Sequence, residues 1–339
     1  MCAATTSSEL KPGAMGSASS PEMGSDQDLA GPELISSRRN PLVGRLRALH
    51  QGRGRREQQQ LLLEGTHLLQ EVLRLGLWPE LLVATPAWID RHGDLLMQLQ
   101  QGARQDPGSA LPLRVVSDVV LAAVATTEQP DGVVLTLAMD QLPQAGAWPA
   151  VGGQPGEGPG PQSPLAPLPS FVLALDRLQD PGNLGTLLRC ALAAGVEEVW
   201  LAGGADPYQP KVLRASAGAA LALPLRRLEA LAPALLRAGA EGCQVVATVV
   251  APSAGAPSLG GAAVGTPGQA AAGRPYWELD WGRPTVLLLG NEGAGLDPAL
   301  VALASERVTI PHAAAVESLN VALAAAPLLL ERWRQQLGG

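Results

Sequence analysis

The sequence predicts an α/β protein with two domains, the C-terminal one built around a parallel sheet. In its C-terminal half, apolar runs of strand length alternate with helical segments, and continuous apolar runs are typical of strands buried on both faces. Polar, glycine-rich segments follow three of these runs directly. Because the carboxyl ends of parallel strands lie at one edge of a sheet, these segments are expected to form one ligand site. A chain of 339 residues has room for two domains.

The C-terminal domain is expected to span residues 171–339. Its expected strands are Phe171–Leu175, Val199–Leu201, Gln244–Val249 and Val286–Leu289. Its expected helices are Gly185–Ala194, with Gly195 as a suitable C-cap, Val212–Ala222 and Val321–Leu337. Pro327 is expected to kink the last helix or to mark a late first turn. Residues 252–273 are almost wholly Ala, Gly, Pro and Ser, so we expect a flexible surface insertion there.

A smaller α/β domain is expected over residues 36–143. Its expected strands are Leu61–Gly65, Leu81–Ala84 and Gly132–Leu137, and its expected helices are Thr66–Leu75 and Ser117–Val124, the latter capped by Ser117 or Asp118. Residues 1–35 have the composition of a disordered tail, and residues 144–170 that of a Gly/Pro-rich linker.

The charge of the chain does not decide whether it binds a nucleic acid. The net charge of −7 argues weakly against a nucleic-acid partner, but a global value can hide a local patch. One window without acidic residues contains Arg38, Arg39, Arg45, Arg47, Arg53, Arg55 and Arg56. Leu42, Val43, Leu46 and Leu49 interleave with these arginines and suit one face of a helix. A folded basic surface and a solvated face or tail both fit the pattern.

Other features of the sequence argue against a metalloprotein, a membrane-spanning protein and a nucleotide-dependent oxidoreductase. Cys2, Cys190 and Cys243 have no metal-ligand spacing, and the histidines are dispersed, so no metal site is expected. Three unpaired cysteines and no apolar run of about 18 residues indicate a cytoplasmic protein without a membrane span. A nucleotide-dependent oxidoreductase would need Gly-x-Gly-x-x-Gly after its first strand, and that fingerprint is missing.

Three motifs carry a resemblance to a known family. They are Asp180-Pro-Gly-Asn-Leu-Gly-Thr-Leu-Leu-Arg189, Leu289-Gly-Asn-Glu-Gly-Ala-Gly-Leu296, and Ile310-Pro311 with Ser318-Leu-Asn-Val321. In this order they resemble the motifs of the SpoU/TrmH family of RNA 2'-O-ribose methyltransferases. The earlier segments Asn40-Pro41, Leu63-Glu64-Gly65, Ser117-Asp118 and Gln129–Gly132 are similar to that family's small N-terminal substrate-binding domain.

The resemblance implies a fold, a cofactor and partners. The C-terminal domain would be a trefoil-knotted SPOUT domain preceded by a small α/β RNA-binding domain. The cofactor would be S-adenosylmethionine, and the substrate RNA, ribosomal in preference to transfer RNA. The chain would form a homodimer through the C-terminal domain. True knots are rare, so this topology comes from the resemblance and not from the pattern.

The resemblance also assigns site residues. Those expected to bind the cofactor are Thr248, Leu289, Gly290, Ile310 and Leu319. Those expected at the reacting groups are Asn183, Arg189, Glu292, Ser318 and Asn320. The family's proposed role for Arg189 is to assist deprotonation of the ribose hydroxyl. Because a guanidinium stays protonated, electrostatic stabilisation of the developing alkoxide is the better-founded role. The arginines expected to bind RNA are Arg38, Arg39, Arg45, Arg53, Arg55 and Arg56.

Alternatives stay open. Taken alone, Asn183 fits a loop turn, Glu292 a cap or exposed loop residue, and Ser318 with Asn320 a helix N-cap. The chain also fits an RNA-binding or ribosome-assembly factor that keeps the fold without catalysis, or a tRNA 2'-O-methyltransferase. His312-Ala313-Ala314 stands where the family has Met-x-Gly, so a local backbone adjustment is expected there.

Overall fold

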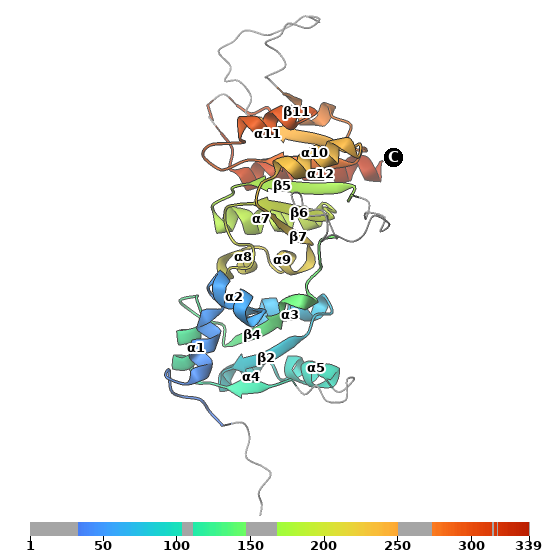
Figure 1. Ribbon diagram of the computed structural model, residues 1–339. Coiled ribbons are helices and arrows are strands. Elements are labelled where there is room, and N and C mark those ends of the chain that lie inside the picture. Colours follow the sequence, from blue (N-terminus) through green and yellow to red (C-terminus); the bar gives the residue numbers. More distant parts are fainter. Residues whose placement is uncertain are drawn as a thin grey trace, which may run out of the picture.

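The computed structural model describes residues 33–103, 111–146, 168–249, 273–313, 315–316 and 318–338. Two sheets organise this part of the chain, with the N-terminal one at one end of the molecule and the C-terminal one at the other (Figure 1). The expected tail, linker and insertion lie largely outside the described residues. Ile35, the last residue of the expected tail, forms a bridge with Val116 and so belongs to the N-terminal domain's structure.

The N-terminal sheet has the strand order β1-β4-β2-β3, with β4 antiparallel to both of its neighbours. Its strands are β1 (Gln60–Glu64), β2 (Pro79–Ala84), β3 (Leu113–Val115) and β4 (Val133–Ala138). Its helices are α1 (Pro41–Ala48), α2 (Gly52–Gln58), α3 (Thr66–Arg74), α4 (Pro86–Arg91), α5 (Gly93–Ala103) and α6 (Asp118–Val124), with a 3-10 turn at Met139–Gln141.

Alternation along the strands divides this domain's core into two layers. Leu61 and Leu63 pack with residues of α3, α4 and α5, whereas Leu62 packs with residues of α1 and α6. Successive side chains of a strand point to opposite faces, so each apolar run supplies both layers. Val43 and Leu46 are buried, which confirms the expected apolar face of the arginine-rich helix.

The C-terminal sheet has the strand order β7-β6-β5-β10-β8-β11-β9, and every pairing in it is parallel. Its strands are β5 (Phe171–Asp176), β6 (Glu198–Ala202), β7 (Leu225–Leu228), β8 (Gln244–Thr248), β9 (Arg274–Pro275), β10 (Thr285–Leu289) and β11 (Glu306–Thr309). Its helices are α7 (Pro181–Ala193), α8 (Pro210–Ala215), α9 (Ala219–Ala222), α10 (Ala232–Ala240), α11 (Pro298–Leu303) and α12 (Val321–Leu337), with a 3-10 turn at Tyr276–Glu278. The expected α/β class is confirmed.

Helices cover both faces of this sheet. Leu187, Leu213 and Leu328, from α7, α8 and α12, belong to one apolar cluster, and Leu235 and Leu300, from α10 and α11, belong to the other. Every residue of β5, β6 and β10 is buried, as continuous apolar runs require.

Two helices differ from the sequence prediction. α7 begins at Pro181, four residues before the predicted start, because Asp180 caps it by accepting a hydrogen bond from the Asn183 amide at 2.8 Å. The single helix predicted over residues 212–222 is two helices, since Ala217 and Gly218 have φ values of 46° and 86°. Left-handed residues end a helix, and the chain turns between α8 and α9.

The last helix has the predicted bounds and continues past Pro327 to Leu337. It runs parallel to α7, because Asn320 contacts Asn183 near the start of both helices and Trp333 lies against Gly195 beyond the end of α7. Arg332 is 1% exposed and fastens the helix to the sheet. Its guanidinium donates to the carbonyls of Arg283 at 2.7 Å and Ser170 at 2.9 Å.

No helix among the described residues has the length and apolarity that a membrane span needs.

Candidate active site

A cavity of about 340 Å³ opens at the carboxyl ends of β8, β10 and β11. Thr248, Leu289 and Thr309, the last residues of these strands, line it. All the residues expected to bind the cofactor lie in its wall: Thr248, Leu289, Gly290, Ile310 and Leu319. Leu296, Val321 and Leu328 add apolar surface. The cavity therefore combines apolar walls with the carboxyl ends of three strands.

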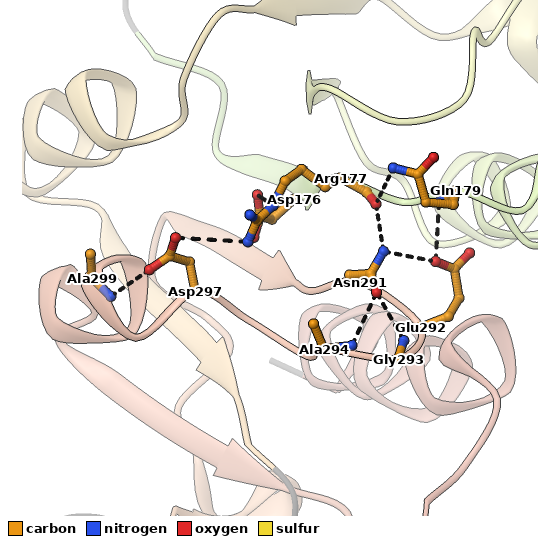
Figure 2. A network of polar contacts seen from close by, with 9 residues as sticks. All are labelled: Asp176, Arg177, Gln179, Asn291, Glu292, Gly293, Ala294, Asp297 and Ala299. Carbon is orange, nitrogen blue, oxygen red and sulfur yellow. Dashed lines mark hydrogen bonds and ion pairs between the residues drawn. The ribbon is translucent and has the colours of Figure 1, made fainter.

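The loop after β10 folds back on itself at Gly290. Asn291 and Gly295 exchange two backbone hydrogen bonds of 3.0 Å, which closes the loop. The Asn291 carboxamide oxygen accepts from the amides of Gly293 at 2.9 Å and Ala294 at 3.0 Å (Figure 2). A Cβ atom on Gly290 would lie 2.3 Å from the Gly295 backbone, so only glycine fits there.

Glu292 joins this loop to the segment after β5. Its carboxylate accepts from the amides of Gln179 at 3.0 Å and Asp180 at 2.9 Å, and from the Asn183 side-chain amide at 3.3 Å. Partial burial raises the pKa of Glu292, but the hydrogen bonds from these two backbone amides and from Asn183 outweigh burial and leave its pKa below the ordinary value. The carboxylate is thus ionised and held between two strand ends.

Asn320 brings in the third motif. Its side-chain nitrogen donates to the Asn183 carboxamide oxygen at 2.9 Å, while its own oxygen accepts from the amides of Ala322 and Leu323 as the N-cap of α12. The N-cap role that fits Asn320 in isolation is therefore present together with a contact between motifs. Asn320, Asn183 and Glu292 form one chain of hydrogen bonds across the three motifs, and Ser318 lines the cavity beside it.

Arg189 stands apart from this network. It is exposed on α7, and no hydrogen bond or ion pair joins it to another described residue. At about 100° per residue it lies about 240° around the helix from Asn183. Gly185, between them, serves packing, because a Cβ there would lie 2.4 Å from the Ala215 side chain on α8. The three residues of this motif thus have different roles. Asn183 joins the hydrogen-bond network, Gly185 packs against α8, and Arg189 presents an exposed guanidinium.

Comparison with known proteins identifies the family. A family model described as the SpoU rRNA methylase family matches residues 170–330, and one described as an MRM3-like substrate-binding domain matches residues 40–135. An uncharacterized tRNA/rRNA methyltransferase of Synechocystis is 41% identical over 89% of this chain and 94% of its own length. The chain belongs to the SpoU methylase family. The expected resemblance is therefore confirmed, and the protein is an RNA methyltransferase.

Two further relatives match over nearly the whole chain. The 23S rRNA guanosine 2'-O-methyltransferase RlmP of Bacillus subtilis is 30% identical over 87% of this chain and 97% of its own length. The structure of an AdoMet-bound rRNA methyltransferase from Sinorhizobium meliloti is 28% identical, with a TM-score of 0.64 over 89% of this chain and 97% of that one.

The arginines expected to bind RNA do not share one environment. Arg38, Arg39, Arg45, Arg53 and Arg56 are exposed. Arg55 is buried, and its guanidinium donates to the Leu49 and His50 carbonyls and pairs with Asp206 at 2.6 Å. Its placement among the RNA-binding residues is therefore corrected, since a guanidinium enclosed by these partners presents no donor to a phosphate.

Sequence reasoning passed over the charged residues that brace the loop after β5. Arg177 has φ 51° and forms two hydrogen bonds with the buried carboxylate of Asp176, at 3.1 and 3.0 Å. Its guanidinium also lies 3.7 Å from Asp297, and its carbonyl accepts from the Asn291 side chain at 2.8 Å (Figure 2). Asp176 could have been found from the sequence, because it is an acidic residue at the end of an otherwise apolar strand.

The lowered pKa of Glu292 predicts a pH-dependent contribution to stability. A carboxylate whose pKa falls on folding stabilises the fold above its unfolded pKa, and that contribution is lost as the pH falls through the folded pKa. Glu292→Gln, which cannot accept from both amides, is expected to cost about 1 kcal/mol at pH 7. Urea unfolding of both proteins at a series of pH values should show the difference in unfolding free energy shrinking as the pH falls below 4.5, the ordinary pKa of a glutamate. A difference that stays constant down to pH 3 would contradict this account of the carboxylate.

Proposed function

We propose that this enzyme transfers the methyl group of S-adenosylmethionine to a ribose 2'-hydroxyl in ribosomal RNA. The hydrogen-bonded chain of Asn320, Asn183 and Glu292 carries the proposal, because it brings three motifs of the family to one cavity. The names of RlmP and of the Sinorhizobium enzyme support the substrate class, and the AdoMet bound to the latter supports the cofactor.

The cavity residues suit S-adenosylmethionine. The volume of about 340 Å³ lies within the range of small-molecule sites. Leu289, Ile310 and Leu319 offer apolar surface for an adenine ring, and the backbone at Gly290 is free of a side chain. When bound, S-adenosylmethionine supplies an electrophilic methyl group on a sulfonium centre.

The polar residues divide the remaining work. Glu292, Asn183 and Asn320 hold the three loops in place, and Ser318 presents a hydroxyl at the cavity. The free guanidinium of Arg189 suits the substrate side, where it would bind a phosphate or stabilise the alkoxide that forms as the 2'-hydroxyl loses its proton. We also place the enzyme in the cytoplasm, which the free thiols of Cys190 and Cys243 support.

The test is methyl transfer in vitro. Purified protein with labelled S-adenosylmethionine should label deproteinised ribosomal RNA at ribose. Arg189→Ala should lower turnover by about 10²–10³-fold, the usual effect of removing one preorganised electrostatic group. Calorimetry should show its affinity for S-adenosylmethionine unchanged. Label confined to bases would overturn the ribose assignment. Label in transfer RNA alone would show that the substrate is transfer RNA and not ribosomal RNA. Equal loss of affinity and turnover in the Arg189→Ala protein would place Arg189 on the cofactor side.

We propose that the exposed arginines of the N-terminal domain bind RNA phosphates: Arg38, Arg39, Arg45, Arg53 and Arg56. Arg38 and Arg39 precede α1, Arg45 lies on it, and Arg53 and Arg56 lie on α2, so the charges gather at one region of the domain. The match of residues 40–135 to a substrate-binding domain supports this role.

Salt dependence tests this surface. Arg45→Glu combined with Arg56→Glu should weaken RNA binding and reduce its salt slope by about 0.7–0.9 for each phosphate that the variant no longer neutralises. Arg91→Glu, a single charge reversal of another exposed arginine of this domain, on α4, serves as the control and should leave the slope unchanged. If the double variant keeps the wild-type salt slope, these arginines do not contact RNA phosphates and form only a solvated surface.

We propose further that the chain forms a homodimer through α7 and α12. Leu323, Leu330 and Leu337 on α12 are 69%, 50% and 72% exposed. Their seven-residue spacing places them along one side of the helix. Trp333 and Leu192 are also partly exposed, and α7 lies beside α12. An apolar stripe of this kind on one helix is typical of a surface that is buried in an assembly.

Light scattering of the full chain tests the dimer. Leu330→Glu should raise the dissociation constant by at least about 30-fold, the effect of removing an interface residue worth about 2 kcal/mol. Leu236→Glu introduces the same change at a position on α10 that is 60% exposed and should leave the mass unchanged. A wild-type monomer at micromolar concentration would refute the proposal.

A further inference from the structure

An ion pair between a buried guanidinium and a partly exposed carboxylate links the two domains. Arg55 on α2 has a side chain that is 4% exposed, and the carboxylate that neutralises it belongs to Asp206 in the C-terminal domain. Its other bonds are to the neutral carbonyls of Leu49 and His50. A buried guanidinium without its counter-ion is costly, so loss of the Asp206 carboxylate would destabilise the docked arrangement of the two domains.

Asp206 is held in place from both of its oxygens. One accepts from Arg55 at 2.6 Å, and the other accepts from the Tyr208 amide at 3.0 Å and lies 3.3 Å from the Arg227 guanidinium on β7. The carboxylate is therefore fixed to its own domain before it meets Arg55. Such a preorganised group defines the direction from which the partner domain docks.

The loop that carries Asp206 packs against Leu178, two residues before the first motif. The Ala205 amide donates to the Leu178 carbonyl at 2.7 Å. Gly204, at φ 76°, packs so closely that a Cβ atom there would lie 2.1 Å from the same carbonyl. The amides of the next two residues, Gln179 and Asp180, are the ones that bind Glu292. A continuous run of short contacts thus leads from Arg55 to the catalytic loops.

A second junction lies beside the first. Arg214 on α8 donates to the Thr126 hydroxyl at 2.6 Å and lies 3.3 Å from the buried carboxylate of Glu64 in the N-terminal domain. α8 in turn packs against α7 at Gly185. Figure 1 shows α2 beside α8 at this junction. Both junctions contact the first motif indirectly. The Asp206 loop packs against the residues that precede the motif, and α8 packs against its helix, α7.

We propose that Asp206 is a positioning residue for methyl transfer, whose ion pair with Arg55 fixes the orientation of the N-terminal domain relative to the first motif of the same chain. The inference rests on the proposed function, because the N-terminal domain is taken to carry the RNA. In the fixed orientation, RNA bound on α1 and α2 reaches the cavity with its ribose already aligned. Without the pair, each domain keeps its own ligand affinity, but the Arg214 junction alone holds the two sites less strictly in one geometry.

The test compares Asp206→Asn with a matched control. Glu241→Gln removes a carboxylate that also pairs with an arginine at 2.6 Å, but within one helical region of the C-terminal domain. Spin labels attached by non-cysteine chemistry at the exposed Val119 and Leu236 report the distance between the domains, in labelled chain diluted with unlabelled chain. Turnover at saturating RNA, RNA affinity and S-adenosylmethionine affinity are measured on the same proteins.

Asp206→Asn should broaden the distance distribution and lower turnover by about 10- to 100-fold, the cost of misaligning the reacting groups. Both affinities should stay at wild-type values, and Glu241→Gln should behave as wild type. Arg55→Met with Asp206→Asn removes both charges, so no unpaired buried charge is left to unfold the protein. This double variant should remain slow.

An Asp206→Asn protein with the wild-type distance distribution, or with wild-type turnover, would overturn the proposal, as would a double variant that recovers full turnover. These outcomes are separate from failure of the proposed function, which would appear as a wild-type protein that labels no RNA.

Discussion

The pairing of β10 with both β5 and β8 is the constraint on which the rest of the structure depends. Leu289 stands opposite Leu175 in this register, and Leu288 stands opposite Ala247. The three strands therefore end together, and the loops that follow them meet at one edge of the sheet. A shift of β10 by one residue would exchange its two faces and move Gly290 and Glu292 away from the loop after β5.

Within that frame, most of the polar residues of the motifs serve to hold one loop against another. Asn291 closes its own loop, Glu292 binds the amides of Gln179 and Asp180, and Asn320 caps α12 while it reaches Asn183. An ionised carboxylate between two backbone amides is a strong connection for its size. Among the described residues, Arg189 and Ser318 make no hydrogen bond to this network, in keeping with the roles proposed for them above.

Arginine performs several different tasks in this chain. Arg332 lies in the core, where it satisfies carbonyls that precede β5 and β10 and stacks 4.5 Å above the centre of the Phe171 ring. Arg55 joins the domains, and the other arginines on and before α1 and α2 are exposed, with Arg53 pairing with Glu57 at 2.6 Å. The planar guanidinium with five donors makes these roles possible, because it can satisfy several oxygens at once when buried.

The sequence by itself determined the α/β class, the strands with fully apolar runs, the family and several of the residues that line the cavity. The class and the strands depend on local pattern, because β5 and β10 are continuous apolar runs, whereas the family and the cavity residues Leu289, Gly290 and Ile310 come from the resemblance of the three motifs. The early start of α7 follows from the Asp180 cap and Pro181 at the first helical position, a local signal that the prediction missed, and the break between α8 and α9 follows from two left-handed residues. The environment of each arginine was decided only in three dimensions. Arg55 and Arg56 are neighbours in one acid-free run, yet Arg55 meets Asp206, 151 residues later, and Arg56 is exposed. The burial of a charge depends on where its counter-ion lies in the folded chain, and that position is set by the packing of two domains.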